Sequence, residues 1–437
     1  MAEPLSVSWA GVRRAGAKSM AVVTGADMAS ISEADLAAAL ALAVWIYLIV
    51  GHGRFWRWRA EPVADELPAG LDTLPEIVAI IPARNEADGI GTAVTSLLTQ
   101  DYPRPVSVIV VDDQSTDGTA ELARQAAEAI GAGDRLIVRA GQNLPPGWTG
   151  KLWAVAQGVD LAGEKFPDAQ YWLLTDGDIH HDFANLRELA TRAETAGLDL
   201  ASLMVRLRID SFWDRLLIPA FVFFFQMLYP FSRVADPRRR EAAAAGGCML
   251  VRRRALEAAG GIGAIRDRLI DDCALAALLK RRGGAIWLGL SDRTYSLRRY
   301  RGLRDIWDMV ARTAYTQLRY SPWLVGGTVL AMGMAYLVPP LALAVGLWRG
   351  EMLTAVLGGA GWLLMAVAYL PTVGRYRLAP PVALSLPVAG VFYALMTLSS
   401  AWRHYRGAGG AWKGRHYDGP RGSRPAAALS DEDTPSS

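Results

Sequence analysis

Four long, uncharged and apolar stretches limit how this chain can fold. The first covers residues 36–50, and the other three cover residues 323–348, 352–370 and 382–400. About 20 residues of α-helix span the roughly 30 Å of a bilayer's hydrocarbon core, so these stretches have roughly membrane-spanning length. The sequence therefore predicts a transmembrane anchor over residues 34–56 and a C-terminal region of transmembrane helices over residues 321–402.

The charges beside the first stretch predict its orientation. Arg54, Arg57 and Arg59 follow it directly, and such positive flanks stay on the cytoplasmic side. We therefore expect an uncleaved anchor, with the domain after it in the cytoplasm. A cleaved signal peptide is the alternative, but the stretch starts late and no small-residue cleavage site precedes the arginines.

The C-terminal end leaves the topology open. Three further crossings would place the end of the chain outside, whereas the basic residues that follow favour the inside. These residues are Arg403, Arg406, Lys413 and Arg415. One stretch is therefore expected to be re-entrant or interfacial, and the sequence does not say which. Pro339–Pro340 is expected to break the first of the three.

The remaining segments carry weaker signals. We predict a loose extension over residues 1–33, a Pro-rich and acidic linker over residues 60–75, and a basic, then disordered tail over residues 403–437. Residues 212–231 are unusually aromatic for a segment inside a domain. They indicate either a buried core helix or an interfacial helix that seats the domain on the bilayer, and we favour the second.

Composition argues against several classes of protein. The net charge is only +3, and no basic stripe interleaved with aromatic residues occurs, so no nucleic acid partner is expected. Two cysteines suggest neither a disulfide framework nor a thiolate metal site. The chain has no G-x-G-x-x-G after its first expected strand and no G-x-x-x-x-G-K-[ST], which argues against dinucleotide-dependent dehydrogenases and P-loop NTPases.

Residues 75–320 alternate short strands with helices. Strands are expected at residues 77–81, 106–111, 136–138 and 171–175, and helices at residues 90–98, 119–130 and 273–282. This alternation predicts an α/β domain whose mostly parallel sheet is covered on both faces. Ligands of such sheets bind at the carboxyl ends of the strands, which is where the polar motifs of this chain fall.

Polar motifs follow the first two strands. Residues 82–86 (PARNE) and 112–119 (DDQSTDGT) each begin where an apolar strand ends. Carboxylates in this position can accept hydrogen bonds from the base and the ribose of a nucleotide. The structural alternative is that Asp112 and Asp117 cap a turn and the helix that follows.

Two aspartates one residue apart follow the strand at 171–175. Asp176 and Asp178 can hold Mg²⁺ or Mn²⁺ through one or two oxygens, with water and a diphosphate in the remaining positions. Such a metal would stabilise the negative charge that grows on a leaving nucleotide. The alternative is an acidic turn with Gly177 at positive φ. His180 or His181 could complete the metal's ligands or be ordinary loop histidines.

In this order, the strand-end motifs resemble those of the inverting family 2 glycosyltransferases, which have the GT-A fold. The resemblance covers residues 75–320 and implies a Rossmann-like sheet, a nucleotide-diphosphate sugar as donor, with a UDP-sugar expected, and a divalent cation. It implies that Asp113 and Glu86 lie near the nucleoside, and that Asp178, helped by Asp176, binds the metal. The donor-binding residues that it implies are Pro82, Arg84, Glu86, Asp112, Asp113, Lys151, Asp176, Gln317 and Arg319.

The resemblance also implies a catalytic base and an acceptor side. Asp271 and Asp272 look like the family's Glu-Asp pair, and Asp272 would take the proton from the acceptor hydroxyl. Both acids precede a helix and could instead cap it. The acceptor-side residues implied are Gly247, Cys248, Asp271 and Tyr320. Gln317 and Tyr320 depart from the Q-x-x-R-W or R-x-R-W pattern of processive relatives, which argues against polymer synthesis.

Three longer segments are similar to the hopanoid-associated (hopene-associated) glycosyltransferases of bacteria. They are residues 144–154 (LPPGWTGKLWA), 313–322 (TAYTQLRYSP) and 412–415 (WKGR). This likeness implies a multi-pass protein of the bacterial inner membrane that decorates a hopanoid lipid. The alternatives are a polyprenyl-phosphate acceptor, which Arg298, Arg299 and Arg301 could serve, and a non-catalytic membrane scaffold with a vestigial transferase domain.

Overall fold

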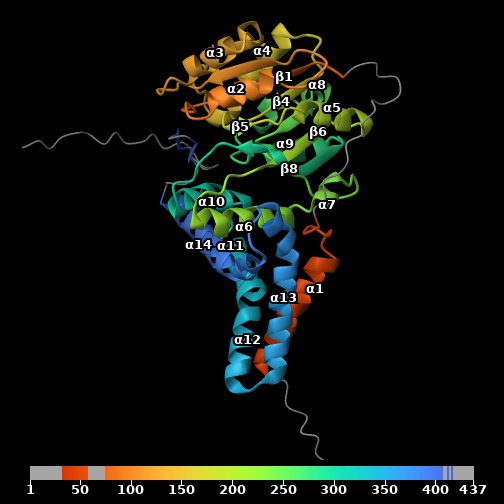
Figure 1. Cartoon of the computed structure of the whole chain (residues 1–437), viewed down its shortest axis with the longest axis vertical. Helices are drawn as coiled ribbons and strands as arrows, with labels where there is room; N and C mark the ends of the chain where they lie inside the picture. The colour runs from red at the N-terminus through yellow and green to blue at the C-terminus, as the bar shows by residue number, and fades with distance from the viewer. Residues whose placement is uncertain (1–31, 58–73, 407–410, 413–414, 417–437) are drawn as a thin grey trace, which may run out of the picture.

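The structure is a computed structural model that describes residues 32–57, 74–406, 411–412 and 415–416 (Figure 1). A domain built on one large sheet lies at one end of the molecule, and long helices extend from it at the other. The expected N-terminal extension, the linker and most of the expected tail lie outside the described residues, as does part of the 412–415 motif.

The eight-stranded sheet has the order β3-β2-β1-β4-β7-β6-β8-β5. Its strands are β1 (Ile77–Ala83), β2 (Ser107–Asp112), β3 (Leu136–Ala140), β4 (Tyr171–Leu174), β5 (Ile179–His180), β6 (Leu200–Arg206), β7 (Met249–Arg252) and β8 (Ile286–Ser296). Strands β3, β2, β1 and β4 are parallel neighbours, which confirms the predicted α/β class.

The other half of the sheet is mixed rather than parallel. Strand β7 runs antiparallel to β4 and β6, and β5 runs antiparallel to β8, while β6 and β8 are parallel. The chain reaches β7 after a long excursion through two helices, α6 (Phe212–Leu228) and α7 (Phe231–Ala235), and enters it at the carboxyl end of β4. A parallel pairing would require a crossover that carries the chain back to the amino end of β4. The chain does not return to that end before β7, so β7 pairs with β4 in the antiparallel direction.

Helices cover both faces of the sheet. One face packs against α4 (Gly150–Lys165), α8 (Arg253–Ala258) and α9 (Asp271–Arg281). The other packs against α2 (Ile90–Leu98), α3 (Thr119–Ala129) and α5 (Asn185–Thr195). All seven residues of β1 are buried, as expected for a strand whose two faces are both covered.

The aromatic segment forms α6, which joins the sheet domain to the long helices. Ser211 and Asp214 form a capping box at its start. Phe223 packs edge-on against Phe55 and Tyr369, and ten of the helix residues are buried. The structure thus supports the buried-core interpretation rather than the interfacial one that we favoured from the sequence.

Three long helices extend from the sheet domain as a bundle. They are α1 (Glu33–Val50), α12 (Val338–Arg349) and α13 (Met352–Arg375), which pack side by side (Figure 1). Helix α11 (Pro322–Met332) leads into α12 through a π-helical turn at Gly333–Leu337. Instead of breaking the stretch, Pro339 and Pro340 lie in the first turn of α12, where helices tolerate a missing N–H donor.

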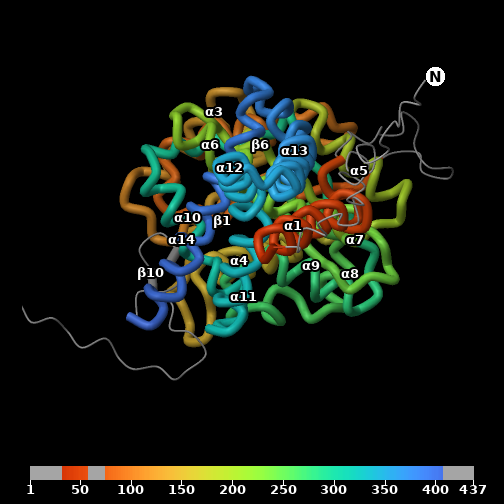
Figure 2. The backbone as a smooth tube through the Cα atoms, turned by 90° about the horizontal axis from the view of Figure 1, so that it is seen from below, coloured from red at the N-terminus to blue at the C-terminus, as the bar shows by residue number. Residues whose placement is uncertain are grey.

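Helix α14 (Leu386–Tyr405) lies apart from this bundle. It packs mainly on α10 (Leu303–Gln317) and α11, with Trp307 Nε1 donating to Ser399 Oγ at 3.0 Å and Arg403 pairing with Asp308 at 2.7 Å. Seen from below, α12 and α13 are viewed nearly end-on, whereas α14 runs across the view (Figure 2). Among the residues that the structure describes, five helical segments are long and apolar enough to cross a membrane: residues 33–50, 212–235, 322–349, 352–375 and 380–405.

Candidate active site

Strand directions bring the predicted motifs to one edge of the sheet. Strands β2, β1 and β4 are parallel, so their carboxyl ends lie at the same edge. Because β7 is antiparallel to β4, with Met249 opposite Leu174, Gly246 and Gly247 lie beside the segment that follows β4. Segments more than 70 residues apart in the chain therefore meet at this edge, as Thr175 Oγ1 shows by donating to Gly247 O at 2.7 Å.

Lys151 is the centre of the charged cluster at this edge. Its Nζ lies 2.8 Å from Asp176 Oδ1 and 3.0 Å from Asp271 Oδ2. Asp272 approaches the same place, since a Cβ built on Gly246 would lie 3.2 Å from Lys151 Nζ and 3.6 Å from Asp272 Oδ2. A side chain at position 246 would push into this cluster, which gives a physical reason for glycine there.

The cluster is electrostatically unusual because three carboxylates share one lysine. Burial by itself would lower the pKa of Lys151, but the negative charges of Asp176, Asp271 and Asp272 outweigh it and raise that pKa. Lys151 is therefore a permanent cation on this edge. It holds together two acids that come from different segments of the chain.

Asp272 lies in surroundings that raise the pKa of its carboxyl group. Its Oδ2 accepts from Gly246 N at 2.9 Å and its Oδ1 from Cys273 N at 2.7 Å. Burial and the neighbouring charge of Asp271 raise the pKa of Asp272 to about 6, against the opposing effects of Lys151 and the two N–H groups. The N-cap residue of α9, Ile270, makes no side-chain capping bond, but Asp272 accepts from the Cys273 N–H in the first turn of the helix, so one carboxylate can both satisfy this N–H and take a proton.

Asp176 and Asp178 are the two carboxylates that the sequence predicts as metal ligands. Asp178 Oδ2 accepts from Ser296 Oγ at 3.2 Å, and Asp176 is bound to Lys151. No group of three or more His, Cys, Asp and Glu side chains able to hold a metal ion occurs among the described residues. Two carboxylates still fit Mg²⁺ or Mn²⁺, which are usually held by one or two carboxylates together with substrate phosphates and water.

The first two motifs lie next to this cluster at the same edge. Arg84 Nη1 donates to Asp113 O at 2.6 Å and lies 3.7 Å from Asp113 Oδ2, so these two predicted donor-binding residues are paired. A Cβ on Gly177 would lie 3.2 Å from Glu86 Cγ, which places Glu86 against the Asp176–Asp178 turn. Pro82 lines a small cavity together with Lys151 and Asp176.

Some acids of the second motif also shape the local turn. Asp112 Oδ1 accepts from Ser115 N at 3.1 Å, and Asp117 accepts from Thr119 N at 3.1 Å and from Ala87 N at 3.0 Å. The capping alternative is therefore realised for these two residues. Asp113, in contrast, is 1% exposed and faces Arg84.

Two acceptor-side predictions need correction. Cys248 is fully buried, and its Sγ receives a hydrogen bond from Asn185 Nδ2 at 3.7 Å in the core on the α5 side, so its side chain points away from Lys151. Tyr320 lies in a turn at positive φ and packs on Tyr315 and His404, and within the described residues no hydrogen bond joins it to the acidic cluster. A glycine-pair motif cannot show on which side of the sheet the next side chain lies.

Two predicted donor-binding residues, Gln317 and Arg319, lie at the end of α10, and they differ in whether they reach the acidic cluster. Gln317 Nε2 donates to the Tyr229 hydroxyl, which itself lies near Asp272 and Cys273, so Gln317 reaches the edge of the cluster. Arg319 is exposed at positive φ, and within the described part of the chain no contact joins it to the acidic cluster.

Of the two histidines that could complete the metal's ligands, His181 has both ring nitrogens engaged in other contacts. His181 is buried with Asn185 Nδ2 at 3.0 Å from Nδ1 and Thr175 Oγ1 at 2.9 Å from Nε2, so both ring nitrogens are occupied. Burial, assisted by His180, lowers the pKa of His181 to about 3, which keeps the ring neutral. His180 stacks on Tyr295 with ring centroids 4.7 Å apart.

Arg312 was missed by the sequence reasoning. It lies on α10. Burial lowers the pKa of its guanidinium group, and the nearby charges of Arg298, Asp271 and Asp176 also affect this pKa. A second cation, the Arg312 guanidinium, thus lies by the acidic cluster besides the Lys151 ammonium group. The available signal was its place on α10 beside the buried positions Ala311 and Tyr315, but a charged residue next to an apolar stripe is common at domain surfaces.

Replacing Lys151 by methionine is expected to destabilise the domain. The change leaves Asp176, Asp271 and Asp272 close together without their shared cation, which should lower the free energy of unfolding by about 1–3 kcal/mol. Denaturant unfolding would measure it. Lys165→Met, at the exposed end of the same helix, is the matched control and should change little; equal losses in both variants would contradict the shared-cation role.

Comparison with known proteins shows what part of this domain is similar to. Residues 78–260 match the family described as glycosyl transferase family 2. The chain is also 46% identical over 54 residues to glycosyltransferase AglE of Haloferax volcanii, a stretch that covers 12% of this chain and 18% of that protein. The chain thus matches only a small part of the length of this curated relative.

A solved structure shares the fold over most of the chain. Mannosyltransferase PcManGT from Pyrobaculum calidifontis, in complex with GDP-Man and Mn²⁺, is 18% identical, with a TM-score of 0.50, and the likeness covers 85% of this chain and 98% of that one. The sheet is therefore of the GT-A type. Residues 78–260 are thus similar to the glycosyl transferase family 2, and the fold agrees with that similarity.

Proposed function

We propose that this chain is an inverting glycosyltransferase that moves a sugar from a nucleotide-diphosphate sugar to a membrane lipid. The observation that carries the proposal is the meeting of Asp176, Asp271 and Asp272 around Lys151 at the carboxyl edge of the sheet. Such edges bind nucleotides in open α/β folds. The non-enzymatic alternative is a scaffold with a vestigial transferase domain. Such a domain would have no need to hold three mutually repelling carboxylates close together.

Asp272 is the residue that we assign to proton transfer. Inversion needs one carboxylate to take the proton of the acceptor hydroxyl while its oxygen attacks the anomeric carbon from the face opposite the leaving nucleotide. The raised pKa of Asp272 makes it a better base than an ordinary exposed aspartate, and its two backbone N–H bonds fix its orientation. Lys151 and Arg312 supply positive charge next to it.

Asp178, with Asp176, would hold the divalent cation. When bound, Mg²⁺ or Mn²⁺ would neutralise the diphosphate of the donor and stabilise the departing nucleotide. Ser296 fixes Asp178 by donating to its Oδ2, and Lys151 fixes Asp176. On the nucleoside side, Arg84 holds Asp113 and the Gly177 turn holds Glu86 near the same edge. A UDP-sugar is the donor that we expect.

The helical part supports a location in the membrane. We infer that α1, α12 and α13 cross the bilayer and that α14 lies along the boundary next to α10, because it runs across the direction of the bundle. Three crossings return the basic end of α14 to the side of the transferase domain, which removes the topological conflict noted in the sequence. Positive flanks favour the cytoplasm for that side, and the membrane that we propose is the bacterial inner membrane.

The acceptor that we propose is a hopanoid lipid, supported by the likeness of residues 144–154 and 313–322 to hopanoid-associated enzymes and by the bundle beside the site. The test uses the purified full chain with Mn²⁺ and radiolabelled UDP- or GDP-sugars, offered either a hopanoid or a polyprenyl phosphate. Label in the hopanoid supports the proposal, and label in polyprenyl phosphate alone favours the second acceptor. No hydrolysis or transfer with any donor would overturn the transferase assignment.

The pH dependence of transfer should report on Asp272. Because the base must be ionised and its pKa is about 6, kcat/KM is expected to be level above pH 7 and to fall about tenfold per pH unit well below pH 6. A pH series with saturating Mn²⁺ would measure this limb. A profile that stays level down to pH 4.5 would argue against Asp272 as the base.

A further inference from the structure

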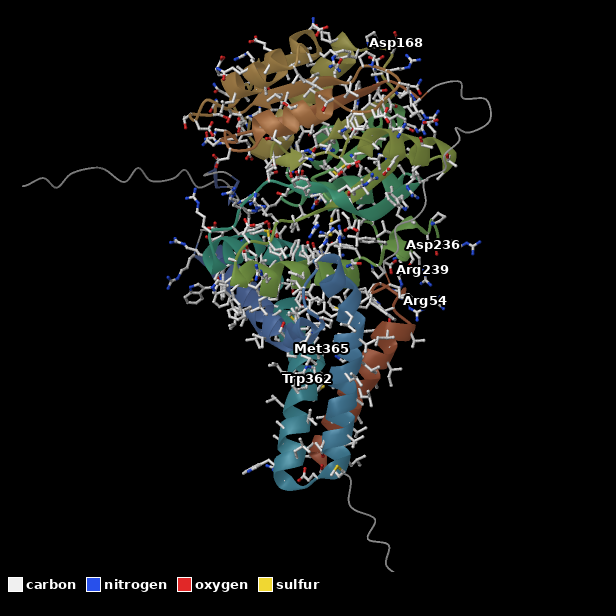
Figure 3. The ribbon with its side chains drawn as sticks, in the orientation of Figure 1. Arg54, Asp168, Asp236, Arg239, Trp362 and Met365 are labelled. Atoms are coloured by element: carbon white, nitrogen blue, oxygen red, sulfur yellow. The ribbon has the colours of Figure 1, made fainter. Side chains whose placement is uncertain are left out.

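A large cavity lies on the side of the sheet away from Lys151. It has a volume of about 1140 Å³ and is lined by the segment that follows α1, by α5, α7 and β8. Leu189 and Leu203 in its wall belong to the core under α5, whereas Lys151 lies on the α4 side. In Figure 3, Arg54, Asp236 and Arg239 mark this region, beside the upper end of α1 and just below the sheet. The cavity is therefore separate from the proposed active site.

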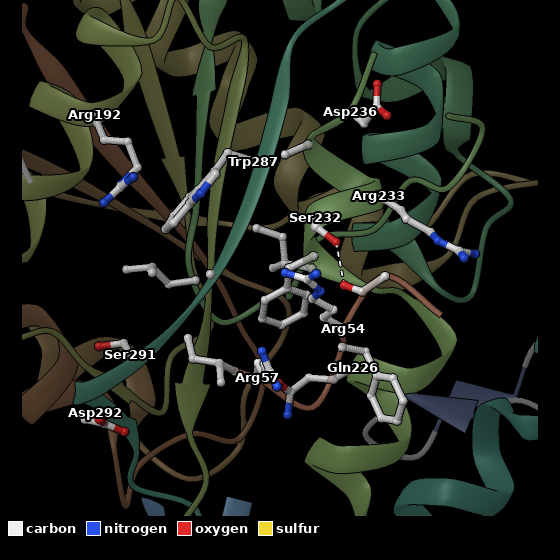
Figure 4. A pocket seen from close by; sticks show the side chains of 18 of the residues that line it. Arg54, Arg57, Arg192, Gln226, Ser232, Arg233, Asp236, Trp287, Ser291 and Asp292 are labelled. Carbon is white, nitrogen blue, oxygen red and sulfur yellow. Dashed lines mark hydrogen bonds between the residues drawn. The ribbon is translucent and has the colours of Figure 1, made fainter. Parts of the chain in front are cut away.

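Positive charge in this cavity is incompletely balanced. The carboxylates in its wall already have partners: Asp182 and Glu188 pair with Arg293, Asp292 with Arg375, and Asp236 with Arg239. Within the described part of the chain, neither Arg54 nor Arg57 forms an ion pair, and Arg57 lies over the Trp56 ring at 4.7 Å. Figure 4 shows both arginine side chains among the residues that line the cavity.

The segment that carries these arginines is held in place. Ser232 Oγ donates to Gly53 O at 2.8 Å, drawn as a dashed line in Figure 4, and Arg233 Nη2 donates to Gly51 O at 3.0 Å. Gly53 has φ 64° and packs so closely on Pro230 that a Cβ would lie 2.8 Å from it. Arg54 itself has φ 50°, an uncommon left-handed conformation for a non-glycine residue. Conformations of this kind persist where the surroundings fix them and are frequent at ligand sites.

The neighbouring helix indicates where a ligand would come from. Val50, the last residue of α1, lines the cavity, and the half-buried Trp56 follows at the position of an interfacial aromatic side chain. If α1 crosses the bilayer, as proposed above, the cavity opens at the level of the lipid headgroups. Arginine guanidinium groups bind phosphate oxygens through two parallel hydrogen bonds.

We propose that this cavity binds the phosphate group of an anionic phospholipid headgroup through Arg54 and Arg57. The bound headgroup would attach the transferase domain to the membrane surface through a contact that is independent of the nucleotide-sugar site. The inference rests on the membrane location proposed for α1, but it requires no catalytic activity of the chain.

Calorimetric titration of the full chain in a neutral detergent tests this site. The titrants are short-chain phosphatidylglycerol, short-chain phosphatidylcholine and inorganic phosphate, with no donor or metal present. Arg54→Gln/Arg57→Gln is expected to weaken phosphatidylglycerol binding by about tenfold or more. Arg238→Gln/Arg240→Gln, which removes the same charge from an exposed loop outside the cavity, is the matched control and should retain wild-type binding. Melting curves would show that both variants are folded.

The outcomes separate the possible ligands. Loss of phosphatidylglycerol binding in the cavity variant alone supports the headgroup site. Equal loss in both variants, or in neither, overturns it. Binding of inorganic phosphate that depends on Arg54 and Arg57, without binding of phosphatidylglycerol, keeps the phosphate site but overturns the lipid source. Flotation of the wild-type chain with neutral phosphatidylcholine vesicles tests the membrane location separately. A chain that does not float with these vesicles would contradict the proposed topology.

Discussion

Replacing Asp272 by asparagine is expected to lower the rate of sugar transfer by about 10²–10⁴-fold, the range that a general base contributes. Asparagine keeps the size of the side chain but cannot take the proton of the acceptor hydroxyl. Because Asp272 is assigned to the acceptor's proton and not to the donor, binding of the nucleotide-sugar should survive. Single-turnover transfer and calorimetric donor binding would measure the two effects on one preparation.

The control for this change is Asp267→Asn, which alters an exposed aspartate shortly before α9. Its transfer rate should equal that of the wild type. If Asp272→Asn transferred at the wild-type rate, the capping role would be the whole function of Asp272. If it lost donor binding and transfer together, with a lowered melting temperature, its hydrogen bonds to Gly246 and Cys273 would be the main contribution.

Replacing Asp178 by alanine is expected to abolish the effect of Mn²⁺ on donor binding. In the wild type, Mn²⁺ should tighten binding of the nucleotide-diphosphate sugar, and removal of the metal with EDTA should reverse it. With Asp178→Ala the dissociation constant in Mn²⁺ should rise by about ten- to a hundredfold, because one of two carboxylates is lost from the site. Titration of donor into protein, with and without Mn²⁺, gives the result directly.

Asp168→Ala is the matched control, since Asp168 is exposed at the end of the molecule opposite the long helices (Figure 3). It should bind donor as the wild type does in either condition. An Asp178→Ala variant with an unchanged response to Mn²⁺ would contradict the metal assignment. This conclusion does not depend on whether Asp272 is the general base.

The local sequence determined the elements and their polar ends. Runs of β-branched residues defined β1 and β2, helical spacing placed α2 at residues 90–98, and uncharged stretches defined the long helices. These are properties of nearest neighbours along the chain, so periodicity and composition are sufficient to predict them. The acids after β1, β2 and β4 followed from the same pattern.

Only the tertiary structure decided which of those groups meet. The antiparallel entry of β7 brings Gly246 to Asp272 and buries Cys248 on the opposite side, and α10 carries Arg312 to the cluster while leaving Arg319 outside it. Whether α14 runs with the bundle or across it likewise depends on packing against α10. Contacts between segments far apart in the chain depend on strand order and helix packing. A single sequence contains no periodic signal for either.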